Sequence, residues 1–266
     1  MELVDIGCNL SHDSFDDDRG AVLERARAAG VVQMIVTGAS EAGSRKALNL
    51  ARSHPGELYA TAGVHPHLAS DYTDITDALL RSLSSDERVV AVGETGLDYF
   101  RDLSPRDVQR EVFRRQLRIG IDSGKPLFLH MRDAHDDFYA MLRDVRDRLC
   151  DVVVHCFTGS RDELRQYLEL DCHIGITGWI CDERRGTHML DFLSDIPTDR
   201  LLVETDAPYL KPRNLRPRVK AHRNEPAWLP WIVGTLAAAR GEHPDFVAER
   251  TTENARRFFR IPAPDG

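Results

Sequence analysis

Histidines and carboxylates follow several short apolar runs of the sequence, and they occur there in tight clusters. The clusters are Gly63-Val64-His65-Pro66-His67, Gly93-Glu94-Thr95-Gly96-Leu97-Asp98, His130-Met131-Arg132-Asp133, His155-Cys156-Phe157-Thr158-Gly159 and Glu204-Thr205-Asp206-Ala207-Pro208. A single histidine in such a place is more often a structural residue, and a single aspartate is often a helix cap. Together, the clusters offer the imidazole and carboxylate ligands that zinc, manganese, iron and magnesium take in proteins. Because a bound divalent ion lowers the pKa of water and makes a nucleophile at neutral pH, we expect a metal-dependent hydrolase.

The apolar runs that precede these clusters are short and lack polar alternation, which is typical of buried parallel strands. We predict strands at 3–6, 31–36, 58–62, 89–92, 127–129, 152–154, 173–176 and 201–203. Stretches with helical periodicity, such as 107–121 and 135–149, lie between them. Eight strands that alternate with helices predict a parallel sheet closed into a TIM-type (β/α)8 barrel, as one catalytic domain over residues 1–266. A doubly wound open sheet is the alternative, but no Gly-x-Gly-x-x-Gly follows any predicted strand.

A barrel gathers the carboxyl ends of its strands at one mouth, where catalytic residues lie. Glu94, His130, His155 and Asp206 come from four such ends. We therefore predict that these four side chains bind one divalent metal ion. The oxygen ligands among them favour the harder ions.

The bulk composition limits the classes of protein that fit. The chain has 266 residues, 42% of them hydrophobic, and a net charge of −8. It has no apolar run near the roughly 20 residues of a membrane span, and its first residues do not resemble a signal peptide. Five cysteines, an odd number without regular spacing, suggest reduced thiols and a cytoplasmic enzyme. We expect a monomer that does not bind membranes.

One segment runs against the acidic average. Residues 211–223 read KPRNLRPRVKAHR, in which six of thirteen residues are Lys or Arg and none is acidic. Pro212 and Pro217 disfavour a long helix and favour an extended loop, which Arg184 and Arg185 would flank. A basic rim around a metal-binding mouth suits a polyanion, although a merely solvated loop is the alternative. If that polyanion is a nucleic acid, we expect single-stranded ends as substrate, because such a mouth reaches a splayed terminal nucleotide more easily than a duplex interior.

Three aromatic residues follow predicted strands near this loop. Phe157, Trp179 and Tyr209 could stack exposed bases, and core packing is an equally good role for each.

The motifs as a set resemble the TatD-type metal-dependent deoxyribonucleases. Besides the clusters at 63–67, 93–98, 155–159 and 204–208, the resemblance includes Cys181-Asp182-Glu183-Arg184-Arg185-Gly186, Arg223-Asn224-Glu225-Pro226, and Asn254-Ala255 followed by Phe258. It extends from Asp5 to about Phe259. The resemblance implies magnesium-supported hydrolysis of phosphodiesters, by 3′-to-5′ digestion of DNA and sometimes RNA, with Mn²⁺ or Zn²⁺ as alternative ions.

The resemblance also implies a role for each matching residue. Glu94, His130 and His155 would be metal ligands, and Asp206 the catalytic carboxylate that orients or deprotonates water. His65 would contact the scissile phosphate. Further support for the ligands and a clamp on the substrate would come from Asp98, Glu204, Arg132, Arg223 and Asn224.

The first predicted strand departs from the pattern of many relatives. They carry Asp-x-His-x-His, with two metal-binding histidines, whereas this chain has Asp5-Ile6-Gly7-Cys8-Asn9. We therefore expect one firmly bound metal ion, and a second that binds weakly or only with substrate.

Two other functions are compatible with a barrel of this kind. A hydrolase of small lactones, amides or phosphotriesters often carries a carboxylated lysine, but here Glu94 takes the bridging place and no lysine ends a strand. A non-catalytic scaffold would need a broken ligand set, and this set is intact. The sequence leaves open the preference between DNA and RNA, and a role in DNA repair, DNA degradation or RNA processing.

Overall fold

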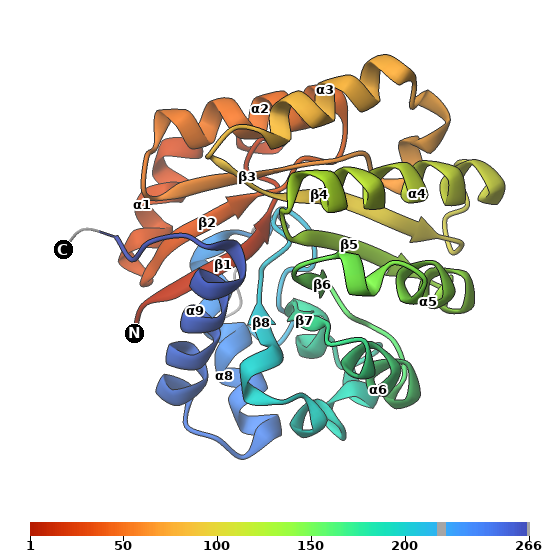
Figure 1. The fold of residues 1–266 in the computed structure, drawn as a ribbon. Helices are drawn as coiled ribbons and strands as arrows, with labels where there is room; N and C mark the ends of the chain where they lie inside the picture. The colour runs from red at the N-terminus through yellow and green to blue at the C-terminus, as the bar shows by residue number, and fades with distance from the viewer. Residues whose placement is uncertain (217–221, 265–266) are drawn as a thin grey trace.

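Eight parallel strands form the centre of the molecule and pair in the order of the chain (Figure 1). A computed structural model describes residues 1–216 and 222–264. The strands are β1 (Leu3–Cys8), β2 (Val31–Val36), β3 (Leu58–Ala62), β4 (Val89–Asp98), β5 (Leu127–Arg132), β6 (Val152–Val154), β7 (His173–Ile176) and β8 (Leu201–Val203). The first and last edges meet where Asp206 N donates to Gly7 O at 2.8 Å and Asn9 N donates to Ala207 O at 2.6 Å. The predicted TIM-type barrel is confirmed, and the open sheet is excluded.

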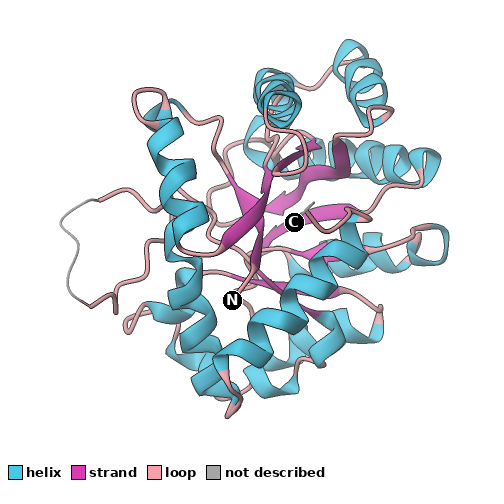
Figure 2. Ribbon diagram, turned by 90° about the vertical axis from the view of Figure 1, so that its left-hand side faces the viewer, coloured by secondary structure: helices cyan, strands magenta, loops and turns pink. Residues whose placement is uncertain are grey.

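Helices surround the strands on the outside (Figures 1 and 2). They are α1 (Arg19–Ala28), α2 (Glu41–Ser53), α3 (Asp74–Ser84), α4 (Arg106–Ser123), α5 (His135–Arg143), α6 (Arg161–Glu169), α7 (Thr187–Leu190), α8 (Leu229–Arg240) and α9 (Pro244–Phe259). Short 3-10 helices lie between them: η1 (Asp13–Phe15), η2 (Pro66–Asp71), η3 (Arg146–Arg148), η4 (Gly178–Cys181), η5 (Leu193–Asp195), η6 (Thr198–Arg200) and η7 (Pro226–Trp228). Within the described residues, no helix is long and apolar enough to cross a membrane.

Several predicted boundaries were wrong; β1 and β5 continue beyond residues 6 and 129, to Cys8 and Arg132. Strand β4 does not end at Val92 but continues to Asp98, because the register against β5 shifts between Val92 and Thr95 and pairing then resumes. Gly96 permits this path: its φ is +150°, and a Cβ there would lie 1.8 Å from the His130 carbonyl oxygen. The predicted helix 135–149 ends early, at Arg143.

The early end of α5 has a local cause in the turn that leads to β6. The Arg146 side chain donates to the carbonyl oxygens of Leu149 and Leu170, which stabilises this turn. The chain therefore leaves the helical path before the apolar periodicity ends.

Apolar side chains bury both faces of the strands, as predicted for a parallel sheet. One cluster includes Val4, Ile35, Phe128 and Leu202 from the strands, and residues of α9 such as Phe258. The larger cluster contains other strand residues and the inner faces of the helices. The polar clusters at the strand ends are thus held by a rigid apolar scaffold.

Candidate active site

A cavity of about 590 Å³ opens at the carboxyl ends of the strands. Its wall contains all four predicted metal ligands and also His65. The lining residues are Asn9, Ala39, His65, His67, Leu68, Glu94, Arg101, Leu103, His130, His155, Cys156, Asp206 and Tyr209. The barrel therefore brings side chains from five strand ends, far apart in sequence, into one cavity.

The Glu94 carboxylate is the centre of this group. Its Oε1 atom lies 2.8 Å from His155 Nε2, 3.1 Å from His130 Nδ1 and 3.4 Å from His65 Nε2. Ligand atoms of His65, Glu94 and His130 all lie within 4.8 Å of one another. Three nitrogens around one carboxylate oxygen are a donor set that a divalent ion can share.

Two further carboxylates contact the imidazole nitrogens that do not face Glu94. His130 Nε2 lies 3.2 Å from Asp98 Oδ2, and His155 Nδ1 lies 3.4 Å from Glu204 Oε2. In metal sites, such a carboxylate fixes the ring orientation and the proton on the outer nitrogen, which leaves the inner nitrogen free to ligate. The residues present therefore fit a divalent metal at Glu94, His130 and His155.

The pKa values of the cluster reflect mutual stabilisation. Burial opposes charge on the rings, but Asp98 and Glu94 raise the pKa of His130, and Glu94 with Glu204 raise the pKa of His155 well above its usual value. Burial likewise opposes ionisation of Glu94, yet the neighbouring imidazoles hold its pKa well below the usual value. A metal ion would replace protons on these rings, since only neutral imidazole ligates.

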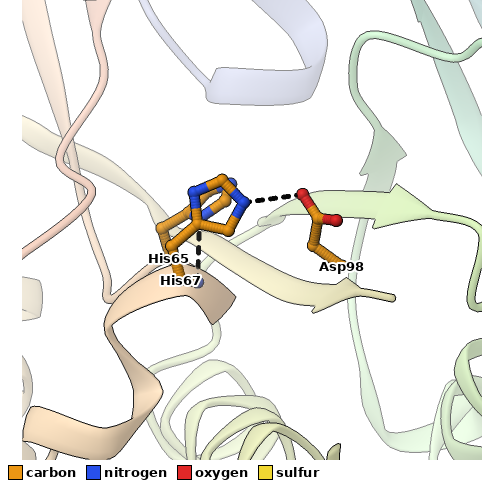
Figure 3. A group of neighbouring side chains, drawn as sticks. All are labelled: His65, His67 and Asp98. Carbon is orange, nitrogen blue, oxygen red and sulfur yellow. Dashed lines mark hydrogen bonds and ion pairs between the residues drawn. The ribbon is translucent and has the colours of Figure 1, made fainter. Parts of the chain in front are cut away.

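His65 has a different electronic arrangement from the other two imidazoles. Its Nδ1 accepts the backbone N–H of His67 at 3.1 Å, and Figure 3 shows this bond beside the one between His67 and Asp98. Burial lowers the pKa of His65 to about 3, so the ring is neutral. A neutral ring that accepts at Nδ1 carries its proton on Nε2, the atom that faces Glu94. His65 is thus arranged as a hydrogen-bond donor to an oxygen in the cavity.

His67 extends the cluster outward along Asp98. Its Nε2 lies 2.7 Å from Asp98 Oδ2, the oxygen that also meets His130, and ligand atoms of His65, His67 and Asp98 lie within 4.8 Å of one another (Figure 3). No role for His67 was predicted from the sequence, although it stands in the same motif as His65.

Asp206 lines the same cavity, and its side chain has a partner outside the group around Glu94. Its Oδ1 accepts from Asn9 Nδ2 at 3.1 Å, a contact between residues that are 197 positions apart. Burial, together with the nearby negative charges of Glu94 and Glu204, raises the pKa of Asp206 to about 8. A cation bound nearby would offset these negative charges and favour the ionised carboxylate, which could then accept a proton from water.

The unusual sequence of β1 has a steric explanation. The Glu204 carboxylate occupies the space beside Gly7, where a Cβ would lie 2.3 Å from Glu204 Oε2. Glu204 is fully buried and accepts the Cys156 N–H at 2.6 Å. Gly7 has no side chain, and Asn9, just after β1, is bonded to Asp206, so neither position supplies a histidine ligand.

The basic residues near the mouth mostly pair within the protein. Arg223 contacts Asp18 at 2.7 Å and Glu225 at 3.0 Å, and Arg213 contacts Glu183 at 3.3 Å. Arg184 and Arg185 both bond Asp182. Asn224 is fully buried, and its side chain donates to the Thr205 carbonyl oxygen at 2.8 Å. Of the predicted basic loop, Pro217, Arg218 and Lys220 lie outside the described residues.

The three aromatic residues singled out from the sequence differ in exposure. Phe157 is buried in the core and packs against Tyr167. Trp179 is only 8% exposed, whereas Tyr209 is 52% exposed and lines the cavity. Core packing is therefore the role of Phe157, and Tyr209 is the one of the three that is available to a base.

Comparison with known proteins matches this site to one family. The family model described as TatD related DNase matches residues 4–260. The chain belongs to the TatD-related DNase family. It is 47% identical over 261 residues to the "3'-5' ssDNA/RNA exonuclease TatD" of Erwinia billingiae, which covers 98% of this chain and all of that protein.

Solved structures agree with the family. The crystal structure of the TatD homologue YjjV from Escherichia coli K12 has a TM-score of 0.89 and 29% identity, and covers 98% of both chains. An uncharacterised metal-dependent hydrolase from Pyrococcus horikoshii, at 14% identity and a TM-score of 0.51, covers 90% of this chain and 54% of its own, and shows the fold alone. This TatD-family chain is therefore a nuclease with a metal-dependent hydrolase fold and a candidate metal site of His, Asp and Glu.

Proposed function

We propose that the chain is a magnesium-dependent exonuclease that digests single-stranded DNA and RNA from the 3′ end, as a monomer with one catalytic domain over residues 1–266. The observation that carries this proposal is the arrangement around Glu94 Oε1, where His130 Nδ1 and His155 Nε2 meet. The name of the Erwinia billingiae relative supports the direction and the substrate.

Glu94, His130 and His155 would hold the ion, and Asp206, which lines the same cavity, would complete the ligand set. When bound, the ion supplies positive charge to a phosphoryl oxygen and lowers the pKa of water. Carboxylate oxygens from Glu94 and Asp206 favour Mg²⁺, while the imidazoles make Mn²⁺ and Zn²⁺ the ions to compare with it.

The remaining steps belong to the side chains of the protein. Asp206, held at Oδ1 by Asn9, accepts the proton of the attacking water. His65 donates from Nε2 to a phosphoryl oxygen, where negative charge grows as the water oxygen bonds to phosphorus. The bond between phosphorus and the bridging oxygen then breaks, and that oxygen takes a proton from solvent and leaves as a hydroxyl group. Asp98 and Glu204 keep His130 and His155 in place.

Hydrolysis of end-labelled oligonucleotides tests this proposal. A single strand labelled at its 5′ end should shorten stepwise from the 3′ end in Mg²⁺, and a chelator should abolish the reaction. A blunt duplex should be cut more slowly, and the same strand in Mn²⁺ or Zn²⁺ ranks the ions. Internal cuts, faster cutting of the duplex or full activity in chelator would contradict the proposal.

A further inference from the structure

Beside the cavity, aromatic rings and guanidinium groups form an alternating stack. The guanidinium carbon of Arg132 lies 4.7 Å from the centre of the Phe100 ring and 4.9 Å from the centre of the Trp179 ring. Arg185 covers Trp179 at 4.2 Å. The stack therefore joins the end of β5 to the segments that follow β4 and β7. Two rings around one guanidinium fix its plane, because cation–π contact and stacking both favour this geometry.

The donor edge of Arg132 is available to a ligand. Within residues 1–216 and 222–264, no acceptor is hydrogen-bonded to its guanidinium, and its ion pair with Asp133 measures 3.9 Å. Arg185, the other guanidinium of the stack, is bonded to Asp182 at 3.1 Å. The Arg132 side chain is 28% exposed. A guanidinium held flat, with five donors and no strong partner, is arranged to receive a phosphate.

The position of Arg132 indicates which phosphate of the substrate it can bind. Arg132 follows the proposed ligand His130 by two residues on β5, so the two side chains share a face of the strand. It is absent from the lining of the cavity that holds Glu94 and His65. A phosphate at Arg132 would therefore lie outside the cavity that holds Glu94 and His65, on the side that His130 shares.

Phe100 supplies the outer face of the same stack. Its ring is 59% exposed, while Trp179 at the inner side is 8% exposed. Because Arg132 and Arg185 cover Trp179, Phe100 is the ring of this stack with an exposed surface, where a flat nucleobase fits. Aromatic stacking of this kind strengthens single-strand binding by about tenfold per base without demanding a sequence.

We propose that Arg132, clamped between Phe100 and Trp179, binds the phosphate next to the scissile one, and that Phe100 stacks the base of that nucleotide. The proposal rests on the exonuclease function given above and deepens it. It assigns the enzyme a second nucleotide subsite that recognises the strand by charge and by stacking.

Neutralising one phosphate in the substrate tests the role of Arg132. Two single-stranded pentanucleotides are compared, one natural and one with an uncharged methylphosphonate at the linkage next to the 3′-terminal one. For the wild-type enzyme, the uncharged linkage should lower kcat/KM for release of the last nucleotide by about tenfold or more, mainly through KM. Arg132→Ala should be slow on the natural strand and should no longer distinguish the two.

Matched variants complete this experiment. Arg132→Lys keeps the charge but loses the planar fork, and should retain part of the discrimination. Arg143→Ala removes a guanidinium that lies over Tyr139 at the end of α5, and should discriminate like the wild type. Phe100→Ala should lose its response to an abasic nucleotide at the second position from the 3′ end, while keeping its response to the methylphosphonate.

Two results would overturn the subsite. One is an Arg132→Ala enzyme that still discriminates the two strands as the wild type does. The other is a wild-type enzyme that cuts both strands equally well. If the wild type cuts neither strand, the exonuclease proposal fails, and fluorescence anisotropy then decides the subsite. In that measurement, Arg132→Ala must bind the natural strand about tenfold more weakly than the wild type does, or the subsite fails too.

Discussion

Histidines occupy both ends of the barrel, and their surroundings differ. At the mouth, His130 and His155 each lie between two carboxylates, and their pKa values are raised. At the start of β7, at the opposite end, His173 packs edge-on against Phe258 and neither of its nitrogens has a hydrogen-bond partner among the described residues. Burial lowers the pKa of His173 to about 4. The comparison shows that the placement of carboxylates, rather than of histidines, separates a metal site from core packing.

The largest loss of activity is expected when the Glu94 carboxylate, at the centre of the active site, is neutralised. Glu94→Gln keeps the size of the side chain but removes the charge that two imidazoles share. Loss of several kcal/mol of transition-state stabilisation corresponds to about 1,000-fold slower hydrolysis of single-stranded DNA. Circular dichroism should show an unchanged fold, and activity near the wild-type level would place the chemistry elsewhere.

His173, at the opposite end of the barrel, should make the free energy of unfolding depend on pH. The unfolded chain binds a proton at His173 below pH about 6.5, whereas the folded chain does so only near pH 4. The free energy of unfolding should therefore fall by about 3 kcal/mol as the pH drops through this window, and His173 should add nothing further below it.

Denaturant titration across this pH range tests the His173 prediction. His173→Leu should reduce the slope of stability against pH, whatever its effect at neutral pH. His243→Gln removes an exposed imidazole at the start of α9 and serves as the control. An unchanged slope in His173→Leu would show that this residue is not the titrating group.

A methyl group at Gly7 on β1 should disturb the active site through its contact with Glu204. In Gly7→Ala, the new Cβ meets Glu204 Oε2, so overpacking should cost about 1–3 kcal/mol of stability. Displacement of Glu204 from His155 should also slow hydrolysis by about tenfold or more. Gly234→Ala, in open space within α8, is the matched control for both measurements. A Gly7→Ala enzyme with wild-type stability and rate would refute the steric explanation of β1.

Sequence alone predicts features that depend on neighbouring residues better than contacts between residues far apart in the chain. Apolar runs located every strand, and the strand-end rule predicted that Glu94, His130, His155 and Asp206 lie at one mouth, where they line one cavity. The same rule could not show that Glu204 fills the space beside Gly7, because their contact exists only after the barrel closes. It also could not separate Arg132 from Arg223, whose partner Asp18 lies 205 residues away in the chain.

The smallest losses of stability and affinity are expected at Arg223, because its guanidinium is paired more closely within the protein than that of Arg132. Its ion pairs with Asp18 and Glu225 are partly exposed, so Arg223→Ala should lower the free energy of unfolding by no more than about 1 kcal/mol. Affinity for a single-stranded oligonucleotide, measured by fluorescence anisotropy, should change less than in Arg132→Ala. A larger loss of affinity in Arg223→Ala would mean that Arg223 leaves its partners to bind substrate.

Pulsed electron paramagnetic resonance of the Mn²⁺-loaded enzyme tests the metal site most directly, because it detects the nitrogens of ligating imidazoles. The wild type should show a nitrogen signal that weakens in both His130→Ala and His155→Ala and persists in His67→Ala. An identical nitrogen signal in all four proteins, or none in the wild type, would contradict a metal centre at Glu94, His130 and His155.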